Sequence, residues 1–98
     1  MSQLRTPARV TLFDLGQVVA TPAAIEFCEV YAVDPLKLIR RHANGDFGDM
    51  DRDDIDANTQ AIKSGARVFS SYQVGAKKVW VITEADRSST CILLPDEY

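Results

Sequence analysis

Apolar residues follow two different spacings along the chain. Up to Gly65 they recur every three or four residues, which is typical of helices with one buried face. After Gly65 they recur at every second residue, which is typical of strands. The pattern therefore predicts helices in the first two thirds of the chain and strands in the last third.

Each predicted helix begins at a residue that can cap its first N–H groups. Thr21-Pro22 and Asp34-Pro35 combine a capping oxygen with a proline suited to the first helical position. The third helix is predicted from Asp51, with Asp54 three residues later as in a capping box, to about Lys63. The residues expected to face inward are Ala24, Ile25, Phe27, Cys28 and Tyr31 in the first helix, Leu36, Ile39 and Ala43 in the second, and Ile55, Ala61 and Ile62 in the third.

Three strands are predicted at residues 67–73, 78–83 and 90–94, joined by a hairpin turn at Gly75-Ala76 and by the polar segment 84–89. Residues 12–13 and 17–20 form a further short strand or strand pair. The predicted fold class is α+β: three short helices packed on a C-terminal three-stranded antiparallel meander, to which an N-terminal strand can be added.

The central predicted strand is apolar on both faces. Trp80 and Ile82 share one face with Glu84, whereas Val79 and Val81 point the opposite way. Helices in a two-layer domain cover only one face. The other face is then either an interface with a second copy or a partner, or it is covered by the N-terminal strand and its loop.

Length and composition indicate one domain spanning residues 1–98, with 46% hydrophobic residues and no apolar run long enough to span a membrane. Cys28 and Cys91 lie in apolar surroundings, which favours buried thiols over a disulfide framework. Residues 1–10 lack the apolar core of a signal peptide, so a cytoplasmic location is expected.

Negative charge is concentrated in one segment. Residues 46–56 carry −5, whereas the whole chain carries −3, so the other residues together are slightly basic. The acidic residues are Asp46, Asp49, Asp51, Asp53, Asp54 and Asp56. Such a row can imitate nucleic-acid phosphates toward a basic protein partner, or it can stabilise and solubilise a helix start. Both interpretations stay open, and direct nucleic-acid binding is not predicted from a pI near 5.0.

The polar segment 84–89 is a second candidate site. Glu84, Asp86 and Arg87 are close enough in sequence to form an ion-paired cluster at a recognition edge. Alternatively, Asp86 or Ser88 bonds to the backbone of an ordinary exposed turn.

Signals for catalysis and metal binding are weak. His42, the only histidine, could act as a base with Glu84 or Asp86, but it belongs to no catalytic motif and is expected to bond a carbonyl at a helix end. The acids at 49, 51 and 53 begin a calcium-loop pattern, which fails at Asp54 and Gln60. No metal or cofactor is predicted. A nucleic-acid-binding alternative would use Lys37, Arg40, Arg41, Arg67, Lys77, Lys78 and Arg87.

Three stretches carry a resemblance that covers nearly the whole chain: LGQVVATP at 15–22, RHANGDFGD at 41–49, and VWVITEADRSST at 79–90 with the ending LLPDEY. They resemble a family of roughly 100-residue bacterial proteins found on plasmids, phages and integrated elements. The resemblance implies an accessory function, with some such proteins acting against CRISPR effectors or restriction enzymes. It implies no enzymatic activity or cofactor.

The sequence thus favours a protein-interaction module over an enzyme. Its expected partner is a nucleic-acid-binding host protein, with a homodimer as a further expectation. The residues expected to bind the partner are the six aspartates of 46–56 together with Glu84, Asp86 and Arg87.

Overall fold

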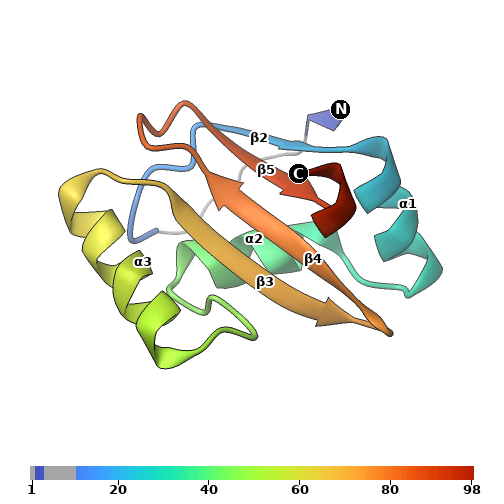
Figure 1. The fold of residues 1–98 in the computed structure, drawn as a ribbon. Helices are drawn as coiled ribbons and strands as arrows, with labels where there is room; N and C mark the ends of the chain where they lie inside the picture. The colour runs from blue at the N-terminus through green and yellow to red at the C-terminus, as the bar shows by residue number, and fades with distance from the viewer. Residues whose placement is uncertain (1, 4–10) are drawn as a thin grey trace.

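The computed structural model describes residues 2–3 and 11–98, so most of the segment examined for a signal peptide lies outside the described residues. The fold combines three helices with one mixed sheet (Figure 1). The helices are α1 (Pro22–Val30), α2 (Pro35–Ala43) and α3 (Arg52–Ser64); the strands are β1 (Ser2–Gln3), β2 (Gln17–Ala20), β3 (Val68–Val74), β4 (Lys77–Thr83) and β5 (Ser89–Leu93); and a 3-10 helix, η1, spans Pro95–Glu97. The predicted α+β class is confirmed. Within the described residues, no helix is long and apolar enough to cross a membrane.

The sheet has the strand order β1-β2-β5-β4-β3. β3, β4 and β5 pair antiparallel, with a hairpin turn at Gly75-Ala76 where Gly75 has a φ of +60°. β2 then pairs parallel with β5, and β1 pairs antiparallel with β2. The predicted meander is therefore only the antiparallel part of a larger mixed sheet. No strand forms at residues 12–13, where Phe13 instead packs into the core from irregular backbone.

The predicted caps begin all three helices. Thr21 Oγ1 accepts from the N–H of Ala24, Asp34 from that of Leu36, and Asp51 from that of Asp54, at 2.9–3.1 Å. The capping box predicted at Asp51 is only half formed among the described residues. The N–H of Asp54 donates to the Asp51 side chain, but the Asp54 side chain is too short to accept from the N–H of Asp51 in return.

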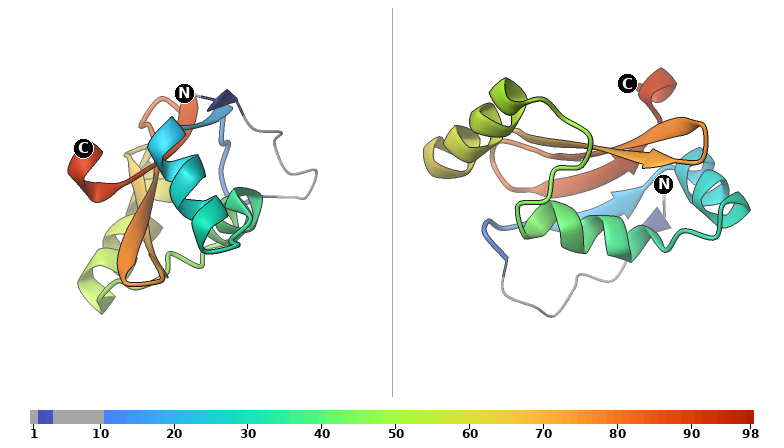
Figure 2. Two further views of the ribbon diagram at one scale, coloured as in Figure 1. Left: turned by 90° about the vertical axis from the view of Figure 1, so that its right-hand side faces the viewer. Right: turned by 90° about the horizontal axis from the view of Figure 1, so that it is seen from below.

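α1 and α2 cover one face of the sheet (Figure 2). Alternate residues of β3, β4 and β5 point into this layer, and Val68, Tyr72, Val79, Val81 and Ile92 are at most 1% exposed. α3 lies beside β3, and both α3 and η1 project on the side opposite α2, where they flank the uncovered face (Figure 2).

The outer edge of β3 is closed by its own chain. The Asn58 amide donates to the carbonyl of Phe69 at 2.6 Å and accepts from its N–H at 3.0 Å. The loop before α3 continues this cover, since Ser71 bonds Phe47 and Asp49 through its backbone. Neighbouring strands therefore find few free backbone groups over residues 69–71.

Candidate functional site

The structure divides the acidic segment into two parts. In the loop, Asp46 forms an ion pair with Arg41 at 2.7 Å, and Asp49 pairs with Nζ of Lys78 at 2.8 Å. The hydrogen bond from Arg41 lowers the pKa of Asp46 below its ordinary value. Two of the six predicted carboxylates are therefore neutralised within the chain.

The other four carboxylates lie at the start of α3. Asp51, Asp53, Asp54 and Asp56 are exposed, and no salt bridge reaches them from the described residues. The charge of Asp51 raises the pKa of Asp54, with Asp53 adding to the effect. The helix start thus presents unneutralised negative charge to the surroundings.

Of the two alternatives for the β4–β5 turn, the ion-paired cluster is wrong, and the ordinary turn with a bond from Asp86 to the backbone is the one that forms. Glu84 pairs with Arg67 at 3.4 Å instead, and Asp86 accepts from the N–H of Ser88 at 3.0 Å. Hydrogen bonding from the side chain of Ser88, and then from its backbone N–H, lowers the pKa of Asp86. Arg87 donates to the carbonyls of Ala61 at 2.9 Å and Ala66 at 2.6 Å. Its guanidinium therefore joins the C-terminal end of α3 and the residues that follow it to the β4–β5 turn.

His42 lies at the centre of a buried polar chain rather than at a helix carbonyl, so the expected contact is wrong. The ring is fully buried, with Nδ1 at 2.5 Å from Oγ of Ser70 and Nε2 at 2.9 Å from Oγ1 of Thr83. Thr83 lies 2.7 Å from Thr90, which donates to the carbonyl of Leu15 at 2.8 Å. The chain thus joins α2 to three strands and the loop before β2.

The last hydrogen bond of this series, from Thr90 to the carbonyl of Leu15, determines which nitrogen of the His42 imidazole carries the proton. Thr90 uses its only hydroxyl proton on the Leu15 carbonyl, so Thr83 must donate to Thr90. His42 then donates from Nε2 to Thr83, and its bare Nδ1 accepts from Ser70. Burial, together with the charge of Arg87, lowers the pKa of His42 to about 3, so the ring is neutral at physiological pH.

This placement does not bring together the histidine and carboxylates that the enzyme hypothesis requires. His42 is enclosed between α2 and the sheet, whereas Glu84 and Asp86 lie on the surface. The described residues contain no group of three or more His, Cys, Asp or Glu side chains placed to hold a metal. The geometry therefore offers no reacting centre at these residues.

The basic residues also do not act as one surface. Arg41, Lys78 and Arg67 are held in the ion pairs described above, and Arg41 also stacks over the Tyr72 ring at 4.5 Å. Lys37 and Arg40 remain exposed on α2, whereas Lys78 points to the opposite face of the sheet, because it alternates on β4 with the inward-facing Val79. The charges that nucleic-acid binding would need are therefore dispersed.

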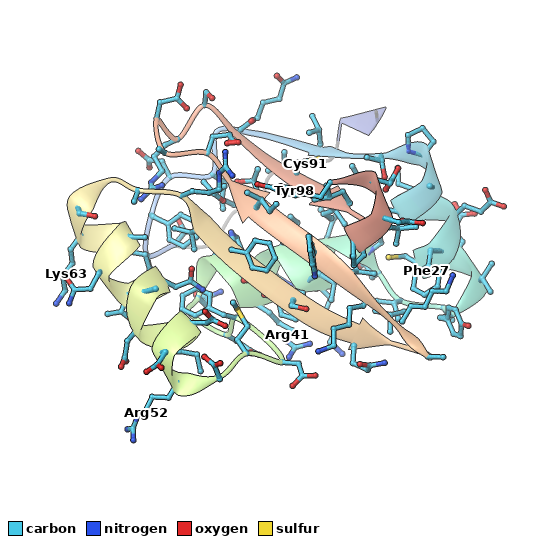
Figure 3. The ribbon with its side chains drawn as sticks, in the orientation of Figure 1. Phe27, Arg41, Arg52, Lys63, Cys91 and Tyr98 are labelled. Carbon is cyan, nitrogen blue, oxygen red and sulfur yellow. The ribbon has the colours of Figure 1, made fainter. Side chains whose placement is uncertain are left out.

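Aromatic residues gather on the uncovered face of the sheet. The rings of Phe69 and Trp80 lie 4.8 Å apart, and Tyr98 packs edge-on against Trp80 at 5.7 Å. Figure 3 shows Tyr98 and Cys91 over β4 and β5, on the side facing the viewer. Neither alternative for this face is fully met: β2 lies within the sheet and does not cover it, yet Trp80 is half-buried and Ile82 is buried. The contributions of Phe69 and Tyr98 were missed, although Phe69 occupies the alternate position on β3 that this face requires.

A groove of about 480 Å³ continues from this aromatic cluster toward the hairpin. It is lined by Lys77, Lys78, Trp80, Leu94, Pro95 and Asp96. No family model, curated protein or solved structure matches the chain, so its function is inferred from its own geometry and charge.

Proposed function

We propose that this chain is a small protein-interaction module that inhibits or modulates a nucleic-acid-processing defence enzyme of a bacterial host. The contact surface is the acidic start of α3, formed by Asp51, Asp53, Asp54 and Asp56. The observation that carries the proposal is the density of unneutralised charge at this point. The resemblance to accessory proteins of mobile elements supports the same class of partner.

The negative charge per unit length of this helix start can be compared with that of duplex DNA. A helix rises about 1.5 Å per residue, so the five steps from Asp51 to Asp56 cover about 8 Å. The four carboxylates and Arg52 leave a net charge of −3 over that length, or about one negative charge per 2.7 Å, whereas duplex DNA carries one per roughly 1.7 Å of its axis. A basic groove that binds duplex DNA therefore meets a linear charge on α3 that is lower than that of DNA but of the same order.

The loop acids and the polar turn contribute less to this surface than the sequence predicts. Asp46 and Asp49 are already paired, and Arg87 is occupied by backbone carbonyls. Glu84 and Asp86 lie at the opposite end of α3 and remain outside the proposed contact. The proposal is thus narrower than the nine residues expected from the sequence.

The test is protection of phage DNA in a host that carries a CRISPR effector or a restriction enzyme. Expression of the chain should raise the plating efficiency of the phage. The double variant Asp53→Asn/Asp56→Asn should reduce the gain at least about tenfold, since each lost contact to a basic partner is worth about 1 kcal/mol.

A matched control separates local charge from net charge. Glu26→Gln/Glu29→Gln removes the same two charges from exposed positions of α1 and should retain protection. Circular dichroism checks that both variants fold, because acids at a helix start also stabilise the helix. Equal loss in both variants, or no protection by the unchanged chain, would refute the proposal.

A further inference from the structure

We infer that a groove beside α3 receives one apolar side chain of the partner protein, carried on a segment whose neighbouring residues are Lys or Arg. The inference rests on the proposed function and states the chemistry of the segment that α3 contacts. The groove has a volume of about 420 Å³ and lies where α3 faces the end of α2 and the residues before β2. Its lining includes Leu12, Phe47, Ile55, Thr59, Ile62 and Lys63.

The groove is apolar, and its rim is open to water. Phe47 is only 5% exposed and belongs to the core, whereas Leu12 and Ile55 are 59% and 39% exposed. The sequence predicts that Ile55 faces inward, yet the described part of the chain leaves it at the edge of this groove. A volume between about 300 and 1,000 Å³ is typical of pockets that enclose a ligand, so the groove can take a large apolar side chain that buries these exposed aliphatic groups.

One face of α3 joins the groove to the acidic start of the helix. Ile55 and Ile62 lie two helical turns apart on this face. Asp51 precedes Ile55 by four residues and continues the same face, with its carbonyl accepting from the Ile55 N–H at 3.0 Å. Residues 51–56 carry a net charge of −3, whereas Lys63 lines the groove near the opposite end of the helix (Figure 3). The groove therefore runs from a negative end to a positive end.

This charge selects a basic partner and disfavours a second copy of the chain. Val30 and Tyr98 are the most exposed large apolar side chains of the described residues, at 72% and 67%. Val30 follows Glu29, and Tyr98 follows Asp96 and Glu97, so either side chain would bring like charges to the start of α3. A segment with Lys or Arg beside its apolar side chain instead pairs with the aspartates while the side chain enters the groove. Such basic segments are typical of proteins that bind nucleic-acid phosphates.

The test is a peptide titration followed by methyl NMR, because Leu12, Ile55 and Ile62 place methyl groups in the groove. The probe is acetyl-GRKLSG-amide, added up to about 5 mM, since contacts of this size bind in the millimolar range. It should shift these methyl signals and leave those of Val30 unchanged. Replacing its leucine by alanine should weaken binding at least about tenfold, and replacing both basic residues by glutamate should abolish it.

Three outcomes of the titration would overturn the inference. Equal binding of the leucine and alanine peptides would show that charge alone holds the peptide. Shifts confined to residues outside the groove would show that the peptide binds elsewhere or not at all. Groove signals that change when the protein alone is diluted would identify a second copy as the occupant.

Ile55→Ser removes the exposed aliphatic group, and Val30→Ser is its matched control on α1, at the other end of the molecule from α3 (Figure 1). Ile55→Ser should weaken peptide binding at least about tenfold and lower phage protection, whereas Val30→Ser should change neither. Circular dichroism checks that both variants fold. Protection that depends on Asp53 and Asp56 but not on Ile55 would overturn this inference alone, whereas normal peptide binding without phage protection would refute only the proposed function.

Discussion

The buried histidine makes the stability of this protein depend on pH in a defined direction. The folded state holds His42 neutral, with a pKa of about 3, whereas an unfolded chain titrates it near the ordinary value of 6.5. Below pH 6.5 the unfolded state therefore binds more protons than the folded state. The stabilisation from neutral His42 is complete above pH 6.5 and is lost as the pH falls toward 3.

The expected loss follows from the difference between the two pKa values. Each pH unit below 6.5 lowers the free energy of unfolding by about 1.4 kcal/mol, so the protein should lose about 2 kcal/mol between pH 7 and pH 5. Few ordinary carboxyl groups titrate in that range. Urea denaturation followed by Trp80 fluorescence at intervals between these pH values measures the change.

The variant His42→Gln provides the comparison, because its amide cannot ionise. It should be less stable than the unchanged protein at pH 7, since its amide carries two N–H groups whereas the buried hydrogen bonds of His42 use only one donor, toward Thr83. Its free energy of unfolding should change little between pH 7 and pH 5. If both proteins lose the same free energy over this range, the burial of neutral His42 is not the cause.

Three further substitutions test the backbone and the sheet edge by urea denaturation. Gly48→Ala should lower the free energy of unfolding by about 3 kcal/mol or more, because a Cβ would meet the carbonyl oxygen of Ser71 on β3 at 2.2 Å. Gly65 has the same φ of +79° but open space around it, so Gly65→Ala should cost only about 1 kcal/mol. Equal losses in the two variants would contradict the contact at Gly48. Ala32→Gly should stabilise by about 1 kcal/mol, since Ala32 has a φ of +55°, and a loss would show that this strain is absent. Asn58→Ala should cost about 2–3 kcal/mol by leaving two backbone groups of β3 unpaired, and exposed Thr59→Ala is its control, expected to change stability by less than about 0.5 kcal/mol.

The helices could be predicted closely because their signals are local. The oxygens of Thr21, Asp34 and Asp51 cap the first N–H groups within three residues of themselves, so no distant contact is needed to place these helix starts. The inward face of α3 was less predictable. Ile55 is 39% exposed, whereas Asn58 is buried, because the edge of β3 offers that amide two backbone partners.

The candidate site also has features that the sequence predicts and features that depend on the fold. That six carboxylates are concentrated in eleven residues is a property of the sequence, and so is the apolar character of both faces at Trp80 once the strand is recognised. Which carboxylates stay unneutralised depends on the fold. Lys78 reaches Asp49 only because the loop at Gly48 runs beside β3, with Ser71 as its bridge partner.

The sequence by itself determined the capped helices, the hairpin turn at Gly75-Ala76 and the location of the acidic segment, because each depends on residues close together in the chain. Tertiary structure decided the parallel pairing of β2 with β5 and the partners of Arg87. It also decided the burial of His42 against hydroxyls from β3 and β4. These contacts join residues tens of positions apart, and no local spacing of apolar or charged residues records which of them the folded chain brings together.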